Sequence, residues 1–186
     1  CTPQLNKRIR VNMNFKTPIV ETERLRLRGR TLDDWPLIRD MWSDPIVTKF
    51  IGGKPKSEED SWTKFLRMMG HWPALGFGYW IVEEKESGNA VGEVGFGDFR
   101  REMEPPMARD PEIGWAFIAS AHGKGYATEA AKAAVAWGDE AFNGGRMSCV
   151  IDPGHKGSIR VAEKCGFKES YRAIYHGEEV MLLHRG

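Results

Sequence analysis

Hydrophobic and polar residues follow two different periods along the first half of the chain. Leucine alternates with arginine over residues 24–30, which predicts a half-buried strand. Apolar residues recur with helical spacing after Thr31 and again after Ser57, and acidic residues follow both caps, so a helix is predicted after each. Residues 76–82 and 90–96 read as the two strands of a hairpin.

The second half of the chain alternates short apolar runs with helical patterns. Residues 112–118 and 147–151 predict strands. Between them, small residues recur at helical spacing from about residue 123 to residue 141, which predicts a helix packed closely on a sheet. A further helix is expected over residues 157–164 and a closing hairpin over residues 171–184. This order of elements predicts a mixed α/β fold.

Composition narrows the class of protein. The chain has 186 residues, of which 41% are apolar and 28% are charged, as in an ordinary soluble domain. Its net charge of +1 gives no electrostatic case for nucleic acid or an anionic membrane as a partner. No apolar run approaches the ~20 residues that span a bilayer. The polar, basic stretch over residues 1–16 lacks the apolar core of a signal peptide.

The cysteines and histidines indicate a reducing compartment and no metal. Cys149 lies in an apolar run and Cys165 ends a helical pattern, so both are expected to be buried free thiols of a cytoplasmic protein. The histidines do not have the spacing of metal ligands, so no metal site is predicted.

The turn before the alanine-rich helix is the strongest functional signal. Residues 122–130 read His-Gly-Lys-Gly-Tyr-Ala-Thr-Glu-Ala and join a strand to the start of a helix. The first N–H groups of a helix have no intrahelical partner, and glycines let the backbone curl around an anion. The spacing fits neither a P-loop nor the dinucleotide fingerprint. A phosphate-bearing ligand is therefore predicted at Gly123–Thr128.

A second segment gives this turn a family context. Residues 155–167 read His-Lys-Gly-Ser-Ile-Arg-Val-Ala-Glu-Lys-Cys-Gly-Phe. Together the two segments resemble motifs A and B of the GNAT acyl-CoA N-acetyltransferases. Residues 21–28 and 42–45 resemble the branch that contains the ribosomal-protein N-terminal acetyltransferases. The resemblance implies a GNAT domain over residues 18–186, preceded by an extension over 1–17. Its fold would be a splayed sheet of about seven strands with about four helices.

The same resemblance implies how acetyl-CoA is bound as cosubstrate. The turn would hold the pyrophosphate, and the pantetheine arm would pair with the exposed edge of the preceding strand. An N–H near Phe117 would polarise the thioester carbonyl. The sequence departs from the family pattern at Ser120, where motif A has Arg or Gln, and at His155, where motif B has Asn. The expected cofactor-binding residues are Phe117, Ile118, Ala119, His122, Gly123, Lys124, Gly125, Tyr126, Ala127, Thr128, His155 and Ser158.

Two residues are the candidates for catalysis. Glu112 shares a strand face with small residues and is the candidate base for the acceptor amine, with Glu93 as second choice. The tyrosine that many family members use as acid is replaced by Ala162. Ser158 is the candidate hydroxyl in its place; Tyr171 and Tyr175 are weaker alternatives.

The acceptor is expected to be a primary amine of a protein, a peptide or a small molecule. Because the sequence marks no carboxylate as clearly buried, an α-amino group, which loses its proton easily, is favoured over lysine. Two aromatic residues, Trp72 and Trp80, and acidic rims at residues 83–86 and 102–104 are alternatives for acceptor contacts. A catalytically weak coenzyme A-binding module and a nucleotide-dependent oxidoreductase are the competing functions. The protein is expected to be a monomer or a homodimer.

Overall fold

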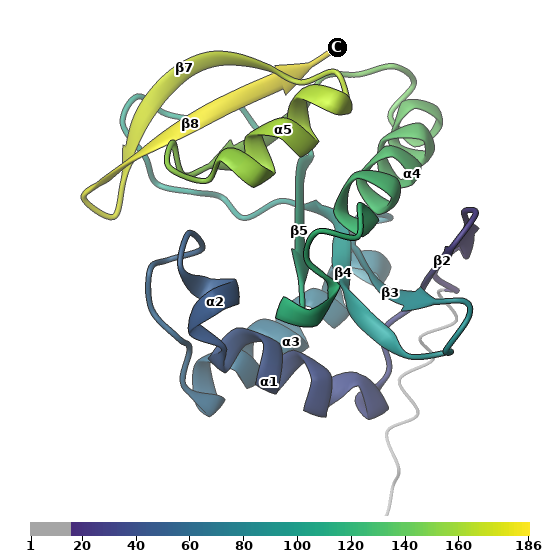
Figure 1. Ribbon diagram of the computed structural model, residues 1–186. Coiled ribbons are helices and arrows are strands. Elements are labelled where there is room, and N and C mark those ends of the chain that lie inside the picture. Colours follow the sequence, from purple (N-terminus) through teal and green to yellow (C-terminus); the bar gives the residue numbers. More distant parts are fainter. Residues whose placement is uncertain (1–15) are drawn as a thin grey trace, which may run out of the picture.

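One sheet of eight strands organises the fold of the computed structural model, which describes residues 16–186 (Figure 1). The strands are β1 (Val20–Glu21), β2 (Leu25–Arg28), β3 (Tyr79–Glu84), β4 (Ala90–Gly97), β5 (Glu112–Phe117), β6 (Met147–Ile151), β7 (Lys168–Tyr175) and β8 (Glu178–Arg185). They lie in the order β1-β2-β3-β4-β5-β6-β8-β7. All neighbouring strands are antiparallel except β5 and β6, which are parallel.

Helices cover both faces of this sheet (Figure 1). They are α1 (Trp35–Ser43), α2 (Pro45–Thr48), α3 (Glu58–Leu75), α4 (Tyr126–Ala141) and α5 (Lys156–Lys164). One hydrophobic cluster lies between the sheet and α4, and a second joins α1 and α3 to the opposite face through Ile81 and Ala116. The mixed α/β GNAT fold expected from the sequence is therefore confirmed, with one short strand and one short helix more than expected.

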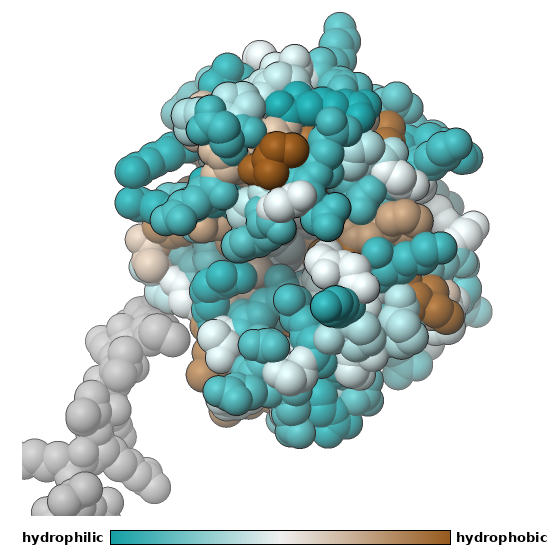
Figure 2. Space-filling model, turned by 90° about the vertical axis from the view of Figure 1, so that its left-hand side faces the viewer, coloured by the Kyte–Doolittle hydropathy of each residue, from teal (hydrophilic) through white to brown (hydrophobic). Residues whose placement is uncertain are grey.

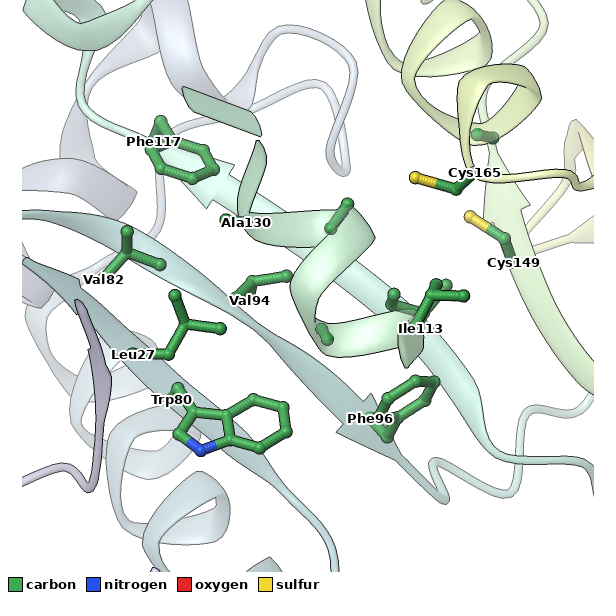
Figure 3. Packing of buried hydrophobic residues seen from close by; sticks show 14 of the residues in the cluster. Leu27, Trp80, Val82, Val94, Phe96, Ile113, Phe117, Ala130, Cys149 and Cys165 are labelled. Atoms are coloured by element: carbon green, nitrogen blue, oxygen red, sulfur yellow. The ribbon is translucent and has the colours of Figure 1, made fainter. Parts of the chain in front are cut away.

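Small residues allow α4 to lie close to the sheet. Ala130, Ala131 and Ala134 are completely buried. A Cβ on Gly138 would lie 2.8 Å from the Cζ atom of Phe96, which is closer than a side chain tolerates. In Figure 3 the side chains of β2–β5 converge beneath this helix, with Phe96 near its C-terminal half. The alanine stripe predicted this contact correctly.

The boundaries of several elements differ from the predictions, and glycine conformations explain two of the differences. Gly76 adopts the left-handed conformation that ends α3, so residues 76–78 are not part of the following strand. The helix α4 begins at Tyr126 rather than near residue 123, because Gly123 and Gly125 both have positive φ angles. The first long strand covers only residues 25–28 of the 24–30 expected.

The two cysteines within residues 16–186 are free and buried, as expected. Cys149 lies on β6 and Cys165 at the end of α5, and both belong to the cluster beneath α4 (Figure 3). The prediction for residues 1–17 falls almost entirely outside the described residues.

Candidate active site

The turn before α4 has the backbone that an anion site requires. Gly123 has a φ angle of +77° and Gly125 one of +81°, a region that glycine occupies without steric cost. Gly125 is the N-cap of α4, and its carbonyl accepts a hydrogen bond from the N–H of Glu129 at 3.1 Å. The N–H groups of residues 126–128 lie in the first turn of α4 and have no partner inside the helix. With the exposed turn they form a position suited to phosphate.

Arg24 holds this turn against the N-terminal strands. Its Nη1 donates to the carbonyl of Lys124 at 3.0 Å, and its Nε donates to Oε2 of Glu129 at 2.7 Å. The backbone N–H of Arg24 also donates to Oε1 of Glu129 at 2.8 Å. The guanidinium lies 4.7 Å from the ring centre of Tyr126. One residue far away in the sequence thus fixes both the turn and the first turn of α4.

The sheet opens next to this turn. Glu112 pairs with Ser148 and Ile113 pairs with Cys149, and these are the only paired positions of β5 and β6. Beyond them the two strands diverge, while β5 continues to Phe117 with β4 on its other side. The divergence that the family resemblance implies is therefore present.

Peptide groups of β5 face the gap between the diverging strands. The N–H of Ile118 donates to β4 at Val91, whereas the carbonyl of Pro111 accepts from β6, both at 3.0 Å. Because successive peptide groups of a strand face opposite edges, the N–H groups of Trp115 and Phe117 face the gap. The carbonyl of Phe117 is already used, since it accepts a hydrogen bond from Nε2 of His122 at 2.9 Å. Ile118 and Ala119 follow this strand and lead through a short 3₁₀ turn over Ala119–Ala121 to the glycines.

A pocket with a volume of about 580 Å³ lies where the gap closes. Its walls come from α1, α3, β3–β6, the start of α5 and the C-terminal hairpin. It brings together five residues that the sequence singled out: Glu93, Glu112, His155, Ser158 and Tyr175. The turn of the β7–β8 hairpin and the segment after α2 both contribute, and they lie on the left of Figure 1. Figure 2 shows that face, whose surface is mostly hydrophilic with isolated hydrophobic residues.

Glu112 is buried in the pocket wall and paired with an arginine. Nε and Nη2 of Arg101 each donate to one oxygen of Glu112 at 2.7 Å. The Arg101 guanidinium also lies 4.9 Å from the ring centre of Phe99 and 5.0 Å from that of Tyr175. The sequence did not mark Glu112 as buried, yet only 5% of it is exposed. Its carboxylate can accept a further hydrogen bond from an amine or a water only through its remaining lone pairs.

Glu93 is the centre of a second buried group of charges. Glu93 is 1% exposed and accepts a hydrogen bond from Nη2 of Arg30. Nζ of Lys64 lies 3.8 Å from Oε1 of Glu93 and 4.4 Å from the ring centre of Trp42. Burial raises the pKa of Glu93, but the charges of Arg30 and Lys64 outweigh it and hold the pKa below the ordinary value. Glu93 is therefore a buried carboxylate between two cations.

Tyr79 reaches across the sheet to the end of the gap. Its side chain runs over Gly95 on β4 towards Gly114 on β5, and its hydroxyl lies where a side chain of Gly114 would begin. Burial, and then the nearby carboxylates of Glu112 and Glu93, raise the pKa of Tyr79 well above its ordinary value. The hydroxyl is therefore neutral at physiological pH and remains a hydrogen-bond donor.

His155 and Ser158 form the start of α5 at the opposite wall. Nδ1 of His155 accepts a hydrogen bond from the N–H of Ser158 at 3.4 Å, which caps the helix. The His155 ring is stacked on Phe50 with 4.7 Å between the ring centres. Burial lowers the pKa of His155, although Asp152 opposes this effect. The lowered pKa keeps the imidazole neutral, so its Nδ1 lone pair is available to cap the helix.

Several alternatives do not lie at the pocket. Trp72 and Trp80 pack in the core beneath α4, so they were wrongly considered as acceptor contacts. The hydroxyl of Tyr171 donates to the carbonyl of Pro106, whereas Tyr175 does line the pocket. The acidic segments over residues 83–86 and 102–104 are also absent from its walls.

Three pocket residues were missed by the sequence analysis: Lys64, Tyr79 and Arg101. Lys64 and Arg101 look like ordinary surface cations in the sequence, because only the fold brings them to buried carboxylates. For Tyr79 a signal exists. Glycines inside strands mark a close approach of another group, and Gly95 and Gly114 are such glycines.

Two negative findings concern residues 16–186. None of the helices in this range is long and apolar enough to cross a membrane. No group of three or more His, Cys, Asp or Glu side chains in it is arranged to hold a metal ion.

Known proteins share both the sequence pattern and the fold of this chain. The pattern of the acetyltransferase (GNAT) domain matches residues 24–168. The uncharacterized protein YkkB of Bacillus subtilis is 36% identical over 160 residues, which are 85% of this chain and 89% of that protein. The uncharacterized N-acetyltransferase p20 of Bacillus licheniformis is 27% identical over 80% of this chain and 81% of its own length. The structure of an acetyltransferase from Agrobacterium tumefaciens superposes with a TM-score of 0.79 and 28% identity, covering 92% of this chain and 96% of that protein.

More distant structures share the fold alone. The ribosomal-protein-S5-alanine acetyltransferase of Vibrio fischeri has a TM-score of 0.69 but only 17% identity, over 91% of this chain and 96% of its own. The spermidine N-acetyltransferase of Vibrio cholerae, solved with CoA and spermine, has a TM-score of 0.68 and 16% identity, over 88% of this chain and 96% of its own. The likeness to the ribosomal-protein acetyltransferases, expected from residues 21–28 and 42–45, is therefore one of fold alone, and membership of that branch is not confirmed. This chain belongs to the GNAT acetyltransferase family and is an acyl-CoA-dependent acyltransferase.

Proposed function

We propose that the protein transfers the acetyl group of acetyl-CoA directly to an α-amino group of a protein, a peptide or a small molecule. The gap between β5 and β6 carries this proposal. It runs from the glycine turn at one end to a pocket with two buried carboxylates at the other. A thioester that lies along it would meet an amine in the pocket.

In this proposal the cosubstrate binds from the turn inward. Backbone N–H groups of Gly123–Thr128 hold the pyrophosphate of coenzyme A, with the positive end of the α4 dipole behind them. The pantetheine arm pairs with the free edge of β5. The N–H of Phe117, which faces the gap by strand alternation, polarises the thioester carbonyl.

The chemical steps are assigned to groups that line the pocket. Glu112 assists removal of the amine proton, with a water between them because Arg101 occupies both carboxylate oxygens. The neutral amine attacks the carbonyl carbon, a C–N bond forms, the nitrogen loses one proton to water and the C–S bond breaks. The leaving thiolate takes a proton from the hydroxyl of Ser158 or from the neutral hydroxyl of Tyr79. The hydroxyl that gave the proton regains one from water.

An α-amine suits these carboxylates better than a lysine does. Arg101 binds both oxygens of Glu112, and Arg30 and Lys64 lower the pKa of Glu93, so neither carboxylate is placed to take a proton from a strongly basic amine. An α-amine has a pKa near 8 and is partly neutral already, whereas a lysine near 10.4 costs about 3 kcal/mol more to deprotonate at neutral pH. The expectation of an α-amine rested on the lack of a clearly buried carboxylate in the sequence, which is wrong, because Glu93 and Glu112 are both buried. The pairing of both carboxylates with cations nevertheless supports the same acceptor.

One observation favours a second candidate, a coenzyme A-binding module with weak activity. The position of the usual family acid is Ala162, which is completely buried and has no hydroxyl. Release of free thiol from acetyl-CoA across a panel of amines distinguishes the two functions. Amine-dependent thiol release, with the acetylated amine found by mass spectrometry, supports the transferase. Tight coenzyme A binding without turnover of any amine supports the module.

A further inference from the structure

The ammonium of Lys64 is almost enclosed and lacks a hydrogen bond. Its side chain is 15% exposed and lines the pocket. The nearest acid is Glu93, whose Oε1 lies 3.8 Å from Nζ, beyond the length of a hydrogen bond. Within residues 16–186, Nζ has two ring contacts, with Trp42 at 4.4 Å and Tyr79 at 5.9 Å. A desolvated charge with three unused donors is unfavourable unless a ligand completes it.

The charges around Lys64 leave an excess of positive charge. Glu93 is already neutralised by its hydrogen bond with Arg30, so Lys64 is the second cation beside one carboxylate. Glu112, across the pocket, is neutralised by Arg101.

Four other residues with charged side chains line the pocket. Arg67 and Lys56 have aromatic contacts but no ion pair with a described residue. Asp60 accepts a hydrogen bond from Ser57, and Asp152 accepts one from the N–H of Gly154. Arg67 and Lys56 add to the positive charge at Lys64, and Glu93 is the acid that opposes it.

Lys64 also lies close to the proposed reaction centre. Glu93 on β4 pairs with Ala116 on β5, the residue directly before Phe117. A group bound by Lys64 therefore lies on the side of Ala116. The N–H of the next residue, Phe117, is the one proposed to face the thioester carbonyl. In an α-amino acid only one carbon atom separates the amine from the carboxylate, so a carboxylate held by Lys64 keeps the amine in this part of the pocket.

We propose that Lys64 binds a carboxylate of the acceptor, so the substrate is an amine that carries a carboxylate beside it, as a free α-amino acid does. This inference rests on the proposed function and narrows its acceptor. A polyamine would place more positive charge beside Arg30, Lys64 and Arg67, which opposes binding. Burial lowers the pKa of Lys64 to about 8, with Glu93 opposing; a bound carboxylate would stabilise the charged form.

The test compares free α-amino acids with their α-carboxamides, with rates corrected for the fraction of neutral amine. For the wild type, kcat/KM is expected to be about 10- to 100-fold higher for the carboxylates. Lys64→Met should abolish this preference, and Lys64→Glu should reverse it. The exposed residue Lys54 provides the matched control, Lys54→Met, which should keep the preference.

The outcomes separate this inference from the proposed function. Equal turnover of carboxylates and carboxamides by the wild type overturns the role of Lys64 but leaves the transferase standing. No turnover of any amine contradicts the transferase. In that case the role of Lys64 is tested by calorimetric titration of the coenzyme A complex with N-acetylated amino acids. An affinity for these ligands that is about tenfold or more lower in Lys64→Met supports the carboxylate site. An unchanged affinity overturns it.

Discussion

The hydroxyl of Tyr79 occupies the space that a side chain on Gly114 would need. The two residues lie on different strands, with β4 between them, and Tyr79 crosses that strand over Gly95. A buried phenol therefore ends at the point where β5 and β6 begin to diverge. The Tyr79 hydroxyl leaves no room for a side chain at residue 114, so glycine is needed there. The space left by the missing side chain is in turn what admits the Tyr79 hydroxyl.

Gly114→Ala is expected to lower stability by about 1–3 kcal/mol, because the buried ring of Tyr79 cannot move away without disturbing the pocket. Adding Tyr79→Phe should recover part of this loss, since it removes the clashing atom. Urea unfolding of the two single variants and the double variant measures the coupling. Strictly additive effects would contradict the contact.

Gly125→Val is expected to weaken acetyl-CoA binding strongly, because its φ of +81° and the N–H groups beside it are both needed by the phosphate site. Gly144 offers a matched control, since it has a φ of +71° in a turn away from the site. Gly144→Val should cost similar stability without loss of affinity. Calorimetric titration with acetyl-CoA is the measurement. Unchanged affinity of folded Gly125→Val would remove the pyrophosphate from this turn.

Glu112→Gln is expected to lower kcat by about 10²–10⁴ and to flatten the acidic limb of the pH–rate profile. Glutamine keeps an oxygen for Arg101 but does not take up a proton. The exposed Glu163 provides a control, Glu163→Gln, with the wild-type profile. A wild-type rate and profile in Glu112→Gln would assign the proton to Glu93 or to bulk water.

Lys64→Met is expected to stabilise the protein at pH 7. Burial lowers the pKa of Lys64 from 10.5 to about 8. Between these pH values the unfolded chain binds more protons than the folded one, so wild-type stability rises with pH there, and the whole penalty is present below about pH 8. The shift corresponds to about 3 kcal/mol. Urea unfolding should show a Met advantage at pH 7 that shrinks towards pH 10.5; an advantage that does not change with pH would contradict it.

Local patterns in the sequence predicted most of the fold. Some elements are predicted by residues that lie close together in the sequence. Examples are the alanines of α4, the cap at Ser57 and the glycine turn. The contacts that make the pocket are different in kind. The pairs Lys64–Glu93 and Arg101–Glu112 join separate elements, and no spacing in the sequence specifies which cation meets which carboxylate. Gly76 shows a smaller limit, since a glycine before a strand can equally end the preceding helix.

The clamp formed by Arg24 makes the N-terminal strands part of the cosubstrate site in thermodynamic terms. Arg24 precedes β2 and holds Lys124, which lies between the two glycines, and Glu129, which lies in the first turn of α4. If a bound pyrophosphate orders that turn, linkage requires that it also strengthens the docking of residues 20–28, by the same free energy. Acetyl-CoA should therefore slow amide hydrogen exchange in β1 and β2. Conversely, a fusion or truncation that loosens these strands should weaken its affinity.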